Sequence, residues 1–256
     1  MLGFSPKLPI CEEDRQWVNE GFNRLKSMLG KHRMLQATVV LPAAEHFPDP
    51  YDGSPAAAEK LFCRVCAFMQ IDHARIDLEI FPDETEQLRK ILPSWRGNPG
   101  KSAAGLYIHA AEGGDREVEN EESRVVVALK STLLKDPLSL VATAAHEVGH
   151  VILFGNGLMD RNTPDHEPMT DLLTVYLGFG IFTANCAARF RQYQEERRGG
   201  WSMQTLGYLP EEVYGYALAK FAAERGEDNS EWARHLSTNV RAYFNRSLAW
   251  LKKNTL

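Results

Sequence analysis

Cysteine is scarce in this sequence, and the four cysteines that occur form no recognisable disulfide framework. Two of them, Cys63 and Cys66, form a Cys-x-x-Cys pair, a spacing that can indicate a redox or metal site. This pair lies inside a predicted helix, lacks the preceding strand of a thioredoxin-type site and has no second pair to complete a metal site. Because a free cysteine behaves as a small hydrophobic residue, the context favours buried, reduced thiols.

Positive charge is also in deficit, since 29 Lys and Arg residues are set against 34 Asp and Glu residues and the formal net charge is -5. The basic residues form only short runs, such as the pairs Arg197-Arg198 and Lys252-Lys253. A surface of this kind does not attract polyanions. We therefore expect neither a nucleic acid nor a membrane as a partner.

Long apolar runs are missing as well. The longest, at residues 172–182, is well below the roughly 20 residues needed to span a bilayer, and it predicts a buried core helix. Residues 1–15 lack the charged segment and apolar segment of a secretory signal, so the expected location is the cytoplasm. No repeat with a period of 20 to 50 residues occurs, which argues against solenoids and propellers.

What remains is an ordinary globular composition, with 256 residues of which 44% are hydrophobic and 25% charged. Apolar periodicity and turn residues predict alternating helices and strands in the first half, and only helices from residue 136 onward. In order, the elements of the first half are a helix at 12–29, a strand at 34–41, a helix at 55–69, a strand at 75–81, and two strands at 105–110 and 124–129 that suit an antiparallel pair. The predicted fold class is α+β, with a small mixed sheet flanked by helices in residues 1–135 and a helical subdomain in residues 136–256, both within one catalytic unit.

The first helix of the predicted helical subdomain runs from an Asp-Pro start at residue 136 to a glycine at residue 155 and carries the sequence HEVGH. His146 and His150 are four residues apart, so their imidazoles project from one face, close enough to share a metal ion. Glu147, beside the first histidine, can reach a metal-bound water. A catalytic zinc ion usually has three protein ligands and a water, whose pKa it lowers towards about 7. The pattern therefore predicts a hydrolytic zinc site in which Glu147 takes the proton.

A third metal ligand is expected downstream, where the next apolar helix is predicted over residues 172–190. Glu167 and Asp171 are four residues apart and can face the same way from the start of that helix. Asp171, His166 and Asp165 are alternatives to Glu167 as the ligand. Acidic residues in this turn are also favoured by the helix dipole alone, without any metal.

HExxH followed by ExxxD on a second helix resembles the gluzincin metallopeptidases, the thermolysin-type clan. The match covers residues 146–171. In that clan the glutamate of the second motif is the third zinc ligand, so the resemblance implies one Zn²⁺ held by His146, His150 and Glu167 within a zincin-like fold. It also implies that Asp171 orients His146, because a partner of this kind fixes the tautomer of a zinc histidine.

Some details of the sequence limit or exclude other interpretations. Pro168 is tolerated only in the first turn of a helix, so Glu167 must lie at or near a helix start. The metzincin extension requires a glycine and a histidine at the positions that Leu153 and Asn156 occupy, and that assignment fails. A peptide deformylase would need a nearby upstream cysteine ligand, but the nearest one, Cys66, is far from the zinc helix.

Substrate-binding groups are less well marked. Zincin peptidases resemble one another in binding an extended peptide along the edge strand before the zinc helix, which here would be the strand at 124–129, although it equally suits an ordinary strand of the sheet. An oxyanion donor would come from the later helices. The available side chains are Tyr208, Tyr214, Tyr216 and His235, and the sequence singles out none of them.

The sequence as a whole predicts a cytoplasmic, zinc-dependent metallopeptidase that acts on a peptide or protein. His146, His150 and Glu167 would bind the zinc ion, and Glu147 would act as general base and then as proton donor to the leaving amine. Two alternatives remain open. One is a zincin-like regulatory or interaction module that binds metal without turnover, and the other is a helical interaction protein that binds no metal.

Overall fold

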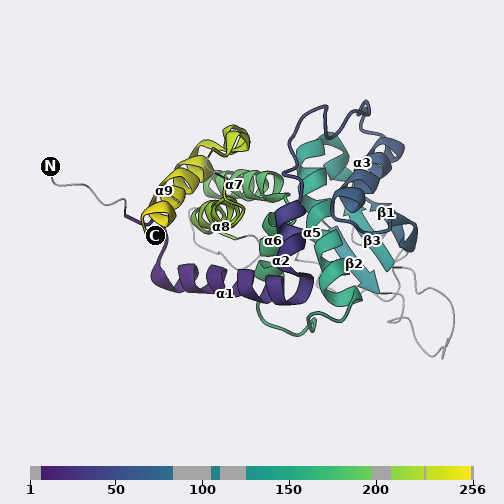
Figure 1. The fold of residues 1–256 in the computed structure, drawn as a ribbon. Coiled ribbons are helices and arrows are strands. Elements are labelled where there is room, and N and C mark those ends of the chain that lie inside the picture. The colour runs from purple at the N-terminus through teal and green to yellow at the C-terminus, as the bar shows by residue number, and fades with distance from the viewer. Residues whose placement is uncertain (1–6, 83–104, 110–124, 198–208, 228, 255–256) are drawn as a thin grey trace. The chain divides into compact units, whose positions relative to one another are not determined.

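The computed structural model of this chain describes residues 7–82, 105–109, 125–197, 209–227 and 229–254 (Figure 1). The chain is a mostly helical protein of mixed α and β structure. It forms two compact units, the helical unit of Met1–Pro42 with Asn162–Leu256 and the sheet unit of Ala43–Arg161. The HExxH helix thus belongs to the sheet unit, whereas the predicted boundary after residue 135 would place this helix in the helical subdomain. That boundary stays a prediction.

The described residues of the sheet unit form three strands, β1, β2 and β3, and two long helices, α3 and α5 (Figure 1). The strands lie in the order β1-β3-β2, with β1 parallel and β2 antiparallel to β3, which confirms both the mixed sheet and the antiparallel pair. Helix α5 packs against β2, β3 and α3. The elements of this unit are α3 (Pro55–Phe68), η1 (His73–Arg75), β1 (Ile76–Phe81), β2 (Gly105–His109), β3 (Val125–Lys130), η3 (Ser131–Lys135) and α5 (Pro137–Gly155).

Helix α5 forms the core of this unit, and its predicted bounds are confirmed. Its N-cap is Asp136, whose carboxylate accepts hydrogen bonds from the backbone N–H groups of Leu138 and Ser139, both at 3.2 Å. By length and composition α5 is apolar enough to cross a membrane, but 72% of that stretch is buried inside the protein. Such burial is typical of a core helix, which agrees with its place against the sheet.

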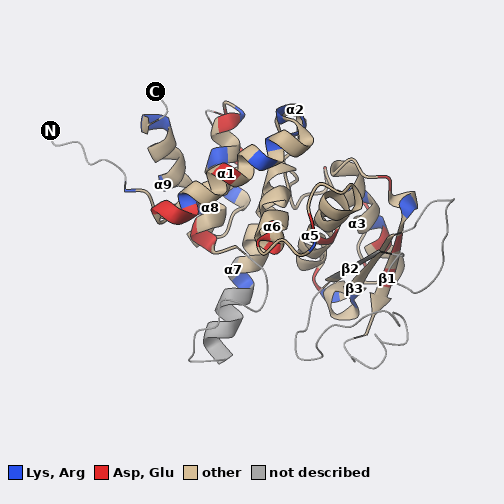
Figure 2. Cartoon of the chain, turned by 90° about the horizontal axis from the view of Figure 1, so that it is seen from below, with Lys and Arg blue, Asp and Glu red and all other residues tan. Residues whose placement is uncertain are grey.

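Within the part of the chain that the structure describes, the helical unit has seven helical segments. Helices α8 and α9 pack side by side, and α1, α6 and α7 pack around α8. Charged residues of both signs are interspersed over α1 and α8 (Figure 2). The ion pair of Lys26 with Glu224 joins these two helices, and Lys220 pairs with the same carboxylate within α8. The segments are α1 (Glu12–Leu29), α2 (Lys31–Gln36), α6 (His166–Tyr176), α7 (Gly180–Arg197), α8 (Glu211–Glu224), η4 (Glu231–His235) and α9 (Thr238–Asn254).

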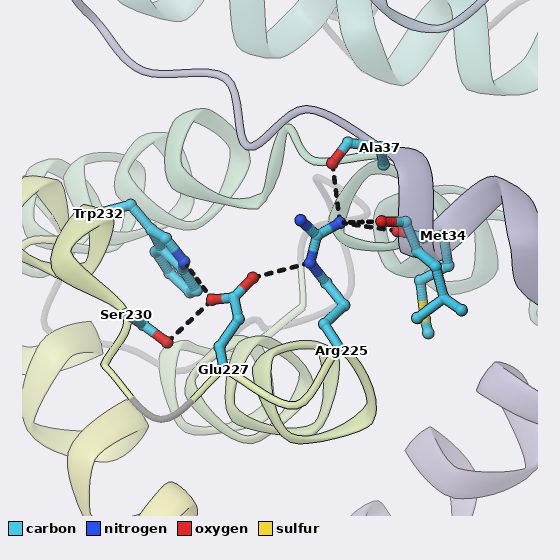
Figure 3. A network of polar contacts seen from close by, with 7 residues as sticks. Met34, Ala37, Arg225, Glu227, Ser230 and Trp232 are labelled. Carbon is cyan, nitrogen blue, oxygen red and sulfur yellow. Dashed lines mark hydrogen bonds and ion pairs between the residues drawn. The ribbon is translucent and has the colours of Figure 1, made fainter.

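The predicted strand at 34–41 is wrong, because the chain there forms the end of α2 and then an irregular segment. The guanidinium of Arg225 donates hydrogen bonds to the carbonyl oxygens of Met34 and Ala37, each at 2.8 Å (Figure 3). Farther along, the N–H of Val40 donates to the carbonyl of Gly178 at 2.9 Å. These partners take up backbone groups that a strand would have offered to a neighbouring strand.

The single helix predicted over 172–190 is also wrong, because α6 ends at Tyr176 and α7 begins at Gly180. Gly178 has a φ of 91°. Its N–H donates to Val175 O, and the N–H of Phe179 donates to Thr174 O, which is the Schellman arrangement that ends a helix. A glycine in the left-handed conformation therefore divides an apolar stretch that has helical periodicity throughout.

Candidate metal centre

The two histidines of the HExxH sequence lie on one face of α5, as their spacing predicts. Their ring centroids are 4.7 Å apart in an edge-to-face arrangement, and the His150 ring stacks on Phe154 at 5.0 Å. His146 is half-buried and His150 is buried. The opposite side of the helix is anchored in the core by fully buried residues such as Val148 and Ile152. The packed backbone of α5 thus fixes the positions of the Cα atoms from which both imidazoles project.

Glu147, which lies between these histidines in the sequence, is buried, and its carboxyl group lies against strand β2. Only 5% of the residue is exposed. It lies close to Gly105 of β2, where an added Cβ would be 2.6 Å from Glu147 Oε1. The sequence interpretation did not single out Gly105. The only local signal was a glycine at the start of a predicted strand, and its partner depends on how β2 packs on α5.

The ExxxD sequence lies at the start of α6. Glu167 is the second residue of this helix and Pro168 the third, so the expectation that Glu167 lies at a helix start is confirmed. Asp171, one turn later, is fully buried, and its Oδ2 accepts a hydrogen bond from the backbone N–H of Leu209 at 2.9 Å. The contact to Leu209 was not predicted, because it joins positions far apart in the chain.

The described residues include one group of His, Cys, Asp or Glu side chains that could hold a metal ion. It consists of His146, His150 and Glu167, each offering one ligand atom, and these atoms lie within 4.8 Å of one another. Two histidines and a carboxylate are a typical ligand set for catalytic zinc. Ligand atoms about 2.1 Å from a tetrahedral zinc ion lie roughly 3.4 Å apart.

The other acidic and histidine candidates for the third ligand lie outside that group. Asp165 precedes α6 and forms an ion pair with Arg24 at 2.9 Å. Nδ1 of His166 lies 3.6 Å from a carboxylate oxygen of Glu167, so it neighbours the candidate ligand. The group of possible ligands contains Glu167 and neither of these two residues.

The candidate oxyanion donors belong to the helical unit. Tyr214 and Tyr216 are buried on α8, and the hydroxyl of Tyr216 donates to Asn19 Oδ1 at 3.2 Å. Burial raises the pKa of Tyr216, as is typical of a packed phenol. His235 ends η4, and its backbone carbonyl accepts a hydrogen bond from Asn185. Tyr208 lies outside the described residues, and the identity of the donor stays a prediction.

Of the two interpretations of the strand at 124–129, a peptide-binding edge strand or an ordinary strand of the sheet, the structure favours the ordinary strand. Strand β3 has β1 on one side and β2 on the other, and residues 127–129 are fully buried. Its backbone groups pair with both neighbours, so it cannot receive a peptide by strand addition. Among the described strands, β1 and β2 occupy the outer positions of the sheet. The order of strands in a sheet depends on pairing between distant segments, which the local pattern does not reveal.

The Cys-x-x-Cys pair is a structural feature of α3. Cys66 is fully buried and Cys63 half-buried, and both are free thiols. Burial raises the pKa of Cys66 to about 12, so its thiol stays protonated at neutral pH. The expectation of buried, reduced thiols is confirmed for Cys66.

Comparisons with known proteins gave no matching family model, no matching curated protein and no matching solved structure.

Proposed function

We propose that this protein is a zinc-dependent peptidase with a zincin-like active site, which hydrolyses a peptide or other amide bond. The observation that carries the proposal is the arrangement on α5, where two imidazoles lie 4.7 Å apart on one face and the glutamate between them in the sequence is buried. His146, His150 and Glu167 would hold the ion, and the fourth position would remain open to water. Bound there, zinc would act as a Lewis acid and would lower the pKa of a bound water to about 7.

The remaining chemistry falls to side chains of this chain. Glu147 accepts a proton from the attacking water as the water oxygen forms a bond to the carbonyl carbon of the substrate. The same carboxyl group then gives that proton to the amine nitrogen as the carbon–nitrogen bond breaks, so that one carboxylic acid and one amine leave. Asp171 would hold His146 in the tautomer that binds metal.

The metal site is tested by measuring zinc per chain in protein purified without a histidine tag and without chelator. We expect about one zinc ion per wild-type chain and a loss of zinc in both His146→Ala and Glu167→Ala. His73→Ala is the matched control, because His73 is an exposed histidine of the sheet unit outside the candidate ligand group. Folded wild-type protein that stays free of zinc after zinc is added back would refute the proposal.

The reaction is tested with a peptide library prepared from a digested proteome, in which new termini are identified by mass spectrometry. We expect cleavage by the wild type and none by Glu147→Gln, which should still bind one zinc ion. Full cleavage by Glu147→Gln would refute the role of Glu147. Full zinc binding with no cleavage of any amide would instead support the metal-binding module without turnover.

A further inference from the structure

Gly105 lies against the side chain of Glu147, where a larger residue would force a neighbouring side chain to shift. It is the first residue of β2, pairs with Leu129 of β3 and is buried. A Cβ added at this position would lie 2.6 Å from Oε1 and 2.7 Å from Cγ of Glu147, and 2.8 Å from Cγ2 of Thr143. All three distances are shorter than those that real Cβ atoms adopt. Because glycine has a hydrogen atom in place of a Cβ, it leaves room for the side chain of Glu147.

Backbone conformation does not explain the glycine. The residues with φ in the left-handed range include Gly30, Gly53 and Gly178, and Gly105 is not among them. Gly105 lies in a regular antiparallel ladder, a conformation that any amino acid can adopt. Glycine in a strand interior also costs stability, because it has no side chain to pack. Close approach to the neighbouring side chain is the feature that requires glycine at this point.

We propose that Gly105 is a positioning residue for the Glu147 carboxylate. The side chains of Glu147 and Thr143, one turn apart on α5, both lie against the position of Gly105 in β2. Glu147 is 5% exposed, so it has little freedom to move away from Gly105 into solvent. The catalytic meaning of this contact rests on the proposed function, whereas the packing contact itself does not.

The consequence for catalysis follows from distance. A methyl group at residue 105 would displace the Glu147 carboxylate by an amount on the order of 1 Å, and misplacement of that size can slow an enzyme by about 100-fold. His146 and His150 project from the same helix but are not among the atoms that the methyl group would meet. Gly105→Ala should therefore separate metal binding, which it spares, from proton transfer, which it impairs.

The packing contact is tested by a double-mutant cycle on metal-free, full-length protein, with thermal unfolding as the measurement. We expect Gly105→Ala to lower Tm by about 4 °C or more in the wild type, and by less than half as much in the Glu147→Ala background. Glu147→Ala removes two of the three close atoms, and the contact to Thr143 persists in both backgrounds. Gly180→Ala is the matched control, because Gly180 and Leu218 both belong to the helical unit and the added Cβ would lie 2.7 Å from a methyl group of Leu218. It should lower Tm equally with and without Glu147.

A loss of Tm from Gly105→Ala that is the same in both backgrounds would overturn the proposal. If Gly105→Ala does not fold, the double variant Gly105→Ala/Glu147→Ala should fold, since the main overlap is gone. Failure of both variants to fold would also overturn the proposal, because the glycine would then serve the strand and not Glu147.

The catalytic consequence is tested on peptides that the wild type cleaves. Gly105→Ala should keep one zinc ion per chain and an unchanged KM, while kcat falls by about 10- to 100-fold. Gly180→Ala should keep the wild-type kcat. Wild-type kcat in Gly105→Ala would overturn the positioning role. Absence of zinc or of cleavage in the wild type would overturn the proposed function alone, because the metal-free cycle still decides whether Gly105 holds Glu147.

Discussion

The buried carboxylate of Asp171 accepts a hydrogen bond from the backbone N–H of Leu209, at 2.9 Å. Asp171 is fully buried on α6, and Leu209 directly precedes Pro210, the N-cap of α8. The contact fixes one oxygen of a carboxylate at the place where the sequence pattern assigns a partner of His146. It also gives the buried backbone N–H group of Leu209 a hydrogen-bond acceptor.

Replacing Asp171 by Asn should weaken zinc binding more than folding. The amide oxygen of Asn can still accept from Leu209, but a neutral group supports a metal-binding histidine less well than a carboxylate does. We expect zinc affinity, measured by competition with a chelator, to fall by about 10- to 100-fold. Glu224→Gln is the control, because it removes a carboxylate of the helical unit that lies outside the candidate ligand group. Equal zinc affinity in wild type and Asp171→Asn would contradict the role of Asp171.

Replacing Gly178 by Ala should destabilise the protein strongly. The residue has a φ of 91°, and an added Cβ would overlap the carbonyl oxygen of Thr38, which is backbone and cannot rotate away. We expect a loss of about 3 kcal/mol or more in the free energy of unfolding, measured with urea.

The matched control for this substitution is Gly226→Ala. Gly226 ends α8 with a φ of 70° and the same two hydrogen bonds as Gly178, but no atom lies within 4 Å of an added Cβ. Its replacement should cost only about 1 kcal/mol. Equal costs at the two glycines would show that the approach of Thr38 is unimportant.

Local sequence signals predicted the helices well. Helix α1 has the predicted bounds 12–29, α3 starts behind Ser54, and α5 starts behind Asp136, in each case because a capping residue and an apolar stripe lie within a few positions. The relative positions of His146, Glu147 and His150 follow from helical spacing in the same way. These features depend on neighbours in the chain, so the sequence alone suffices.

The features that were missed depend on distant partners. The segment at 34–41 has the composition of a strand, but Arg225 binds its carbonyl groups from the end of α8. The central place of β3 follows from pairing with β1 and β2, and the contact of Gly105 with Glu147 follows from the packing of β2 on α5. Periodicity within a segment contains no information on such contacts.

Replacing Arg225 by Lys should loosen the segment after α2. The guanidinium donates through Nη1 to Met34 O and Ala37 O and through Nε to Glu227 at 2.7 Å (Figure 3). A lysine ammonium is a point charge that cannot match this planar, branched geometry. We expect a loss of about 2 kcal/mol in the free energy of unfolding. Hydrogen exchange should also quicken at the N–H of Val40, which donates to Gly178.

The control for Arg225→Lys is Arg241→Lys, since Arg241 is an exposed arginine on α9 of the same unit. It should change the free energy of unfolding by less than about 0.5 kcal/mol. Unchanged exchange at Val40 in Arg225→Lys would show that the irregular segment is held by other contacts.

Glu224 should make the stability of the protein depend on pH below neutrality. Burial by itself would raise the pKa of Glu224, but hydrogen bonds from Lys26 and Lys220 outweigh burial and lower the pKa below its usual value. A carboxyl group with a lowered pKa in the folded state stabilises the protein above its unfolded pKa of about 4.3, and this contribution is lost as pH falls through the folded pKa. Glu224→Gln should therefore lower the free energy of unfolding by roughly 1 kcal/mol at pH 7, and this difference from wild type should shrink between about pH 4.5 and pH 3. Urea unfolding across this range measures the difference, with Glu231→Gln as the control at an exposed glutamate. A gap that stays constant down to pH 3 would show that Glu224 is not held as a carboxylate by the two lysines.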